Sequence, residues 1–360
     1  DHFEISNLNI NNASLIYDFL NSLDFFNFEN IYYILDTISF NEFIINEAKI
    51  AETDYYGEWQ RFEFINFKDM NFDSIILENY YFNEEEIEQE GKLVKIKDLQ
   101  FNRPQNILYF DYNSPDLFFS IFKSLDNFMI KDFWHKDKFD NVTLNGDLYE
   151  ISNLNTVEID NLLFPVTLDF NLKNVYFTDL DPEYSMYLNM LGYDDLAFDL
   201  NFQSSINYQK EEFTISLDTS IYDAFDFKTK LLFSNLDINS LNLSNDTELI
   251  EYFSNKFKFN LFEIEFIDKG MTDKLFLFME DFYGFNKNDI KQLFLEEINN
   301  NEDLQSSIDV KYLKKMLNFI DDPDSIKIII QPQTPMSFNN ILIYSMNPAL
   351  LIEELNISLE

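Results

Sequence analysis

Apolar and polar residues alternate between Leu196 and Phe233, and this alternation constrains the fold more than any other feature of the chain. It extends over three runs, 196–208, 213–221 and 225–233, which short polar segments separate. Successive side chains of a β-strand point to opposite faces, whereas a helix would need a period of about 3.6 residues. The pattern therefore predicts an antiparallel meander with one aromatic face and one polar face.

A degenerate repeat adds a second constraint. The octapeptide FEISNLNI at 3–10 returns as YEISNLNT at 149–156, with six of eight positions identical. Apolar residues stand at i, i+3 and i+5 around an Asn or Asp, so the alternation reverses once at that residue. Such a reversal predicts a strand that kinks or bulges and then continues in the sheet. Looser copies occur at 67–72, 96–101, 159–164, 172–177 and 233–238.

Helices are expected mainly outside these strands. Pro115, Pro182 and Pro348 each follow a capping residue, and they predict helices at 115–130, 182–191 and 348–355. The longest helical stretch, 272–320, is expected to break near Gly284 and at 299–301. The remaining expected elements are a helix at 14–24 and strands at 31–50, 60–67, 75–82, 326–330 and 338–344.

We therefore predict an α+β, mainly β fold, in which an elongated antiparallel meander has an aromatic face covered by a few helices. A β-rich domain spans 1–267. An alternative division splits it into two related halves, 1–140 and 141–267. A helical segment, 268–322, follows. The C-terminal strands and short helix, 323–360, return to the β domain.

The charge of the chain restricts its partners. Its 65 acidic and 25 basic residues give a net charge of −40, which would repel a phosphate backbone, so no nucleic-acid partner is expected. No apolar run approaches the roughly 18 residues of a membrane span. The chain begins at Asp1 and contains no cysteine. We interpret it as a mature periplasmic or extracellular protein whose N-terminal signal has been removed.

No residue pattern points to catalysis, so we expect no enzymatic activity, cofactor or metal. The six glycines are isolated and cannot form a phosphate-binding loop or a nucleophile elbow. Of the two histidines, His2 is terminal, and His135 is expected in a charged loop beside Trp134. The many carboxylates leave a carboxylate-based hydrolase as one alternative, although most fall on polar strand positions or in acidic runs.

The phenylalanine-rich face is the strongest candidate for a binding surface. A sheet with one apolar face must bury that face, either as a closed core or as a groove that accepts an acyl chain. The sequence leaves both alternatives open. If the face is a groove, the expected ligand-binding residues are Phe170, Phe198, Phe202, Phe213, Phe225 and Phe227.

The kinked amphipathic strands resemble those of bacterial envelope proteins of the AsmA and related lipid-transfer type. The segments 268–274 and 331–335 are similar to uncharacterised proteobacterial envelope proteins. This resemblance implies a non-enzymatic cell-envelope protein that binds a lipid, another apolar ligand or an envelope protein partner. It carries no catalytic residue. The alternative is a structural surface-layer or adhesin-type component that associates through cations.

Overall fold

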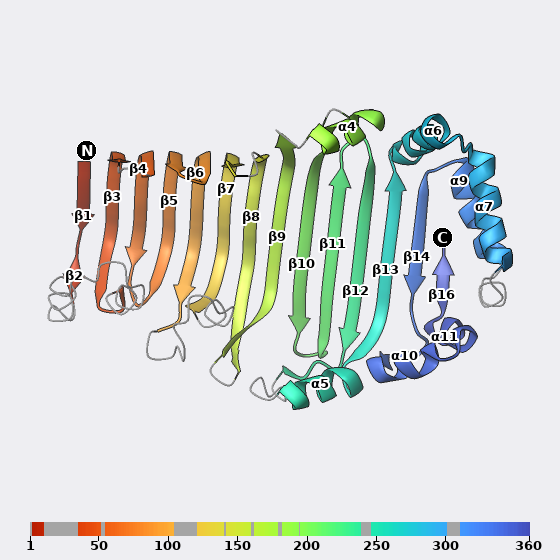
Figure 1. Cartoon of the computed structure of the whole chain (residues 1–360). Coiled ribbons are helices and arrows are strands. Elements are labelled where there is room, and N and C mark those ends of the chain that lie inside the picture. The colour runs from red at the N-terminus through yellow and green to blue at the C-terminus, as the bar shows by residue number, and fades with distance from the viewer. Residues whose placement is uncertain are drawn as a thin grey trace. The chain divides into compact units, whose positions relative to one another are not determined.

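The computed structural model describes the chain in two compact units, Asp1–Asp179 (unit 1) and Leu180–Glu360 (unit 2). Antiparallel strands make up most of unit 1, and unit 2 combines an antiparallel sheet with helices (Figure 1). Strands prevail over the described residues as a whole, which confirms the mainly β fold class. The described residues are 2–10, 35–51, 55–103, 121–139, 142–159, 162–178, 182–193, 195–238, 246–300 and 310–360.

Unit 1 is an antiparallel meander in which consecutive strands pair from β3 to β9, with β1 added beside β3. Its strands are long, and the longest, β8, has 18 residues. The bounds are β1 (His2–Ser6), β2 (Asn9–Ile10), β3 (Ile38–Ala51), β4 (Tyr55–Phe67), β5 (Asn71–Glu84), β6 (Ile87–Phe101), β7 (Phe122–Asp137), β8 (Val142–Ile159) and β9 (Leu162–Thr178).

Two lines of kinks cross this sheet. At each line the register skips one residue per strand, so the side chains three positions apart that flank it share a face. The two lines are six positions apart along every strand from β3 to β8. Kink line A passes through Asn41, Asn66, Asp73, Asp98, Asp126 and Asn153, and kink line B through Glu47, Gln60, Asn79, Lys92, Asp132, Asp147 and Asn174.

Left-handed backbone accompanies the kinks in a regular way. Each strand from β3 to β8 has one kink residue at positive φ, always on the second line that the strand reaches along the chain, and β9 has one on kink line B. Asn153 in β8, at φ 54°, and Asn174 in β9, at φ 47°, are examples. Asn and Asp tolerate this conformation better than other non-glycine residues. Side chains also pair along the lines, as Asn66 Nδ2 donates to Asp73 Oδ2 at 2.7 Å.

The predicted reversal of alternation is confirmed at four copies of the repeat, where Asn7, Asp98, Asn153 and Asn174 have positive φ between or within strands. Two other copies differ, and residue 161, the Asn of the copy at 159–164, lies outside the described residues. The copy at 67–72 is the β4–β5 hairpin turn, with Asp69 and Met70 both at positive φ as a two-residue type I′ turn requires. The copy at 233–238 ends a strand at Ser234.

Unit 2 begins with the meander that the alternation predicts. Strands β10 (Ala197–Asn207), β11 (Glu212–Ile221), β12 (Phe225–Ser234) and β13 (Lys258–Asp268) pair consecutively, with a register shift opposite Leu232/Phe233 where Asn260 is skipped. The sheet continues through β14 (Ser325–Ile330) to β16 (Ile357–Leu359), while β15 (Met336–Ser337) pairs with β13.

The helices of unit 2 largely match the expectations from capping residues and prolines. Helices α4 and α11 occupy two of the predicted segments, and the long helical stretch breaks at Gly284, which caps α6 at φ 73°. The bounds are α4 (Pro182–Met190), α5 (Asp246–Asn255), α6 (Met271–Tyr283), α7 (Lys287–Asn300), α9 (Val310–Asp321), α10 (Phe338–Ser345) and α11 (Pro348–Leu355).

Two expected elements were wrong. The helix at 115–130 is contradicted from Phe122 onward, where strand β7 begins. Its helix-like spacing of Phe122, Leu125 and Phe128 arises in part because kink line A separates the last two. The strand at 338–344 is helix α10, which Ser337 caps by accepting a hydrogen bond from the Asn340 amide. The helix expected at 14–24 lies outside the described residues.

The kink geometry predicts how β8 responds to substitution. Asn153→Val should destabilise unit 1 by about 1–2 kcal/mol, because a β-branched residue is strained in left-handed backbone, whereas Asn153→Gly should cost little. Ser152→Val is the matched control and should change stability by less than about 0.5 kcal/mol. Both tryptophans, Trp59 and Trp134, lie in unit 1, so their fluorescence during urea unfolding reports this unit. Equal losses in the two valine variants would contradict the kink assignment.

Candidate functional site

One face of the unit 1 sheet is apolar across seven strands. Between the kink lines, cross-strand pairing aligns two adjacent rows of side chains on the same face. Both rows consist only of apolar or aromatic residues, and Tyr149 contacts both Phe128 and Phe170 edge-on. The rows are Phe43, Phe64, Ile75, Ile96, Phe128, Ile151 and Phe170, and Ile45, Phe62, Leu77, Val94, Ile130, Tyr149 and Leu172.

The kinks extend this apolar face beyond the two rows. Phe40 and Phe43 lie on either side of kink line A with ring centroids 6.1 Å apart, and Trp59 and Phe62 lie on either side of kink line B at 6.3 Å. In a regular strand, residues three apart would point to opposite faces. The extra residue at each kink therefore keeps the apolar side chains on one surface, which we call the apolar face.

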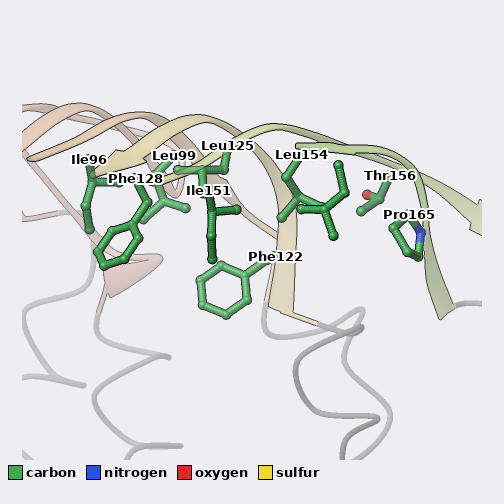
Figure 2. A pocket seen from close by; sticks show the side chains of 10 residues that line it. Ile96, Leu99, Phe122, Leu125, Phe128, Ile151, Leu154, Thr156 and Pro165 are labelled. Carbon is green, nitrogen blue, oxygen red and sulfur yellow. The ribbon is translucent and has the colours of Figure 1, made fainter. Parts of the chain in front are cut away.

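A pocket of about 490 Å³ lies on the apolar face where β6 to β8 cross kink line A, and β9 completes its lining (Figure 2). This volume lies within the range of small-molecule sites, roughly 300–1,000 Å³. The lining includes Leu99, Leu125 and Leu154, which also belong to the buried core cluster of unit 1. The full lining is Ile96, Leu99, Phe122, Leu125, Phe128, Ile151, Leu154, Thr156, Pro165 and Leu168.

The chemistry of the pocket is almost entirely apolar. Its described lining includes no ionisable side chain, and Thr156 is the single residue with a polar side chain. The Thr156 hydroxyl already donates a hydrogen bond to the Lys123 carbonyl at 2.6 Å. Water in such a site would lack the two to four polar partners that it needs, so the pocket favours an apolar occupant.

Near kink line B, aromatic rings lie over glycines. A Cβ at Gly91 would meet the Tyr80 ring at 2.6–2.7 Å, and a Cβ at Gly146 would meet the Phe133 ring at 2.6 Å. The Tyr80 side chain is only 6% exposed, and burial raises its pKa to about 12. The rings thus fill the space that a side chain at either glycine would take, so the sheet has two aromatic rings packed flat against its backbone at this line.

The six predicted ligand-binding residues fall in both units, and none of them lines the pocket. Phe170 lies on the apolar face of unit 1. The other five share one face of the unit 2 sheet, as the register of β10, β11 and β12 shows. The residues on this second face are Phe198, Phe202, Phe213, Phe225 and Phe227.

The face of unit 2 meets side chains from its helical segments. Phe319 of α9 contacts Phe266, the cross-strand partner of Phe227. At the other end, Phe233 stacks on Phe257, which follows α5, with centroids 4.7 Å apart. These contacts are those of a packed core, whereas the pocket described above lies on the unit 1 face.

His135 lies in strand β7, which corrects the expectation of a loop. It stands directly opposite Gln89 of β6, two residues beyond Phe133, so both polar side chains are on the apolar face. Both are half-buried, and within the described part of the chain neither has a hydrogen-bond partner. Their cross-strand neighbours on either side are Phe82 and Leu144.

The comparisons with known proteins locate similarity only in unit 2. Residues 218–360 match the model of a protein family described as "Uncharacterized protein". No curated protein and no solved structure shows significant similarity to the chain. Within the described residues, no helix combines the length and the apolarity needed to cross a membrane.

Proposed function

We propose that this chain is a non-enzymatic protein that binds a lipid acyl chain, or a similar apolar molecule, on the apolar face of unit 1. The observation that carries the proposal is the pocket at kink line A, which has a volume of about 490 Å³ and a lining that is apolar except for Thr156. The resemblance of its kinked strands to AsmA-type proteins supports a place in the cell envelope. The proposal assigns no catalytic residue.

The architecture explains how a sheet provides such a surface. Long strands with strict alternation give apolar rows of limited curvature, and two kink lines per strand allow the sheet to bend without turning these rows outward. The polar residues at the kinks, such as Lys92 and Asp132, pair with each other at 3.2 Å. Because the residues that flank each kink share a face, the apolar face continues across both kink lines.

Filling the pocket should abolish binding without unfolding the protein. Leu168 is half-buried beside the cavity, so the indole of Leu168→Trp can occupy the space in which we place the ligand. We expect this variant to lose at least about ten-fold in affinity for oleic acid, measured by displacement of an anilinonaphthalene sulfonate dye. Organic extraction and mass spectrometry of the purified protein should show less bound lipid than in the wild type.

The matched control is Met129→Trp, which adds the same indole on the opposite face of β7, next to Phe128. It should bind oleic acid within about two-fold of the wild type. Equal affinity in all three proteins would contradict the proposed pocket. Absence of any bound or added lipid in the wild type would instead favour the structural, cation-associated alternative.

A further inference from the structure

We propose that Gln89 and His135 bind the polar head of the ligand, and that this head is uncharged and bears hydroxyl groups, as in a monoacylglycerol. This inference rests on the proposed function. The two residues form a directly opposed cross-strand pair between Phe82 and Leu144, and neither side chain has a hydrogen-bond partner among the described residues. No hydrogen bond among the described residues has to break before these two side chains can bind a ligand.

The chemistry of the pair favours an uncharged head. A glutamine amide offers both donors and an acceptor, and the two ring nitrogens of a histidine can serve as a donor and an acceptor. Hydroxyl groups have the same dual character, so a glycerol head can satisfy both side chains at once. A carboxylate can only accept hydrogen bonds, and it would leave the acceptors of the pair unused.

The charges at this end of the sheet disfavour an anionic head. Asp137 lies two residues beyond His135 on the same face. Glu84 ends β5, and the turn that follows carries Glu85 and Glu86. The nearby cation Lys138 is held by Asn83 and by the Glu84 carbonyl. A carboxylate or phosphate head would therefore approach a net negative rim.

The distance between head site and pocket suits a single chain. His135 stands seven positions after Phe128 of the pocket along β7. At about 3.3 Å per residue the path is on the order of 20 Å. The hydrocarbon core of a bilayer, two chains thick, measures about 30 Å, so one disordered chain spans about 15 Å. A chain that is extended along the strand reaches further than this, as the path requires. Between the two sites the chain would cross Ile130 and Phe133, which share the apolar face.

The test compares three ligands with the same chain and different heads: monoolein, oleate and oleylamine. We expect monoolein to bind most tightly to the wild type in the dye-displacement assay. His135→Ala and Gln89→Ala should each weaken monoolein binding about ten-fold and change oleate binding less than about two-fold. His135→Gln, which keeps a donor and an acceptor, should restore most of the loss. Lys136→Ala, on the opposite face of β7, is the control and should have no effect.

The head site is overturned if oleate or oleylamine binds more tightly than monoolein, or if the double alanine variant keeps wild-type affinity for monoolein. If Leu168→Trp still abolishes binding in that case, the proposed function stands and only the head assignment fails. Wild-type protein that binds none of the three ligands overturns both proposals.

Discussion

Phe67→Ala is expected to cost about 4 kcal/mol of unfolding free energy in unit 1, a value typical of a fully buried phenylalanine. Phe67 has no exposed surface, and its ring stacks on Phe72 with centroids 4.2 Å apart. The side chain also precedes the β4–β5 turn, in which Met70 is equally buried. Its removal therefore opens a cavity at the point where the two strands reverse.

Urea unfolding followed by tryptophan fluorescence measures this loss in unit 1. Phe139→Ala is the matched control, because Phe139 is 90% exposed and should contribute almost nothing. A loss below about 1 kcal/mol for Phe67→Ala would show that the region around the turn is not the core of unit 1. A similar loss for both variants would point to an effect on the unfolded state instead.

Gly91→Val is expected to destabilise unit 1 by about 2–3 kcal/mol, because the Tyr80 ring must leave its buried position to admit the new side chain. The same substitution should cost much less in a Tyr80→Ala background, where no ring occupies the space. Valine even suits a strand better than glycine. The four proteins form a double-mutant cycle, and their urea midpoints give the coupling energy.

Strong coupling between positions 80 and 91 would establish that the glycine is selected for its missing side chain. Additive effects would contradict the ring-over-glycine arrangement. Gly192→Val is not a suitable control, since its φ of 75° makes any side chain there strained. Leu93→Val lies across kink line B from Gly91 and therefore on the opposite face of β6. It tests whether the strand backbone beside this kink tolerates a valine.

Sequence reasoning worked best where alternation is uninterrupted. The runs from Leu196 to Phe233 became β10, β11 and β12 with little change of boundary, because a period of two has only one structural interpretation. The predicted ligand-binding residues lie mainly in unit 2 for the same reason, because regular alternation assigns side chains to a face there. Five of these six phenylalanines lie on one face of the unit 2 sheet. On that face, Phe257 contacts Phe233 and Phe319 contacts Phe266.

The pocket lies where alternation is interrupted, and this explains why its residues were not predicted. Ile96 and Leu99, or Ile151 and Leu154, are three apart, so they read as opposite faces of a strand or as one face of a helix. The repeat had indicated a reversal at Asp98 and Asn153. A further signal was available in the polar residues that recur six positions apart within each strand, such as Asn41 with Glu47 and Asp126 with Asp132. Two reversals per strand follow from that spacing.

The kinks also have a consequence for how such a chain can change in length during evolution. Deleting one residue from an ordinary strand turns every later side chain to the other surface. Deleting Asn153 would instead place Ile151 and Leu154 two apart, so both would still face the same way in a regular strand. Each kink is thus a site where one residue can be gained or lost while the apolar and polar side chains stay on their separate faces of the sheet. We therefore expect the curvature of such a sheet to be adjustable by deletion or insertion at the kinks as well as by substitution.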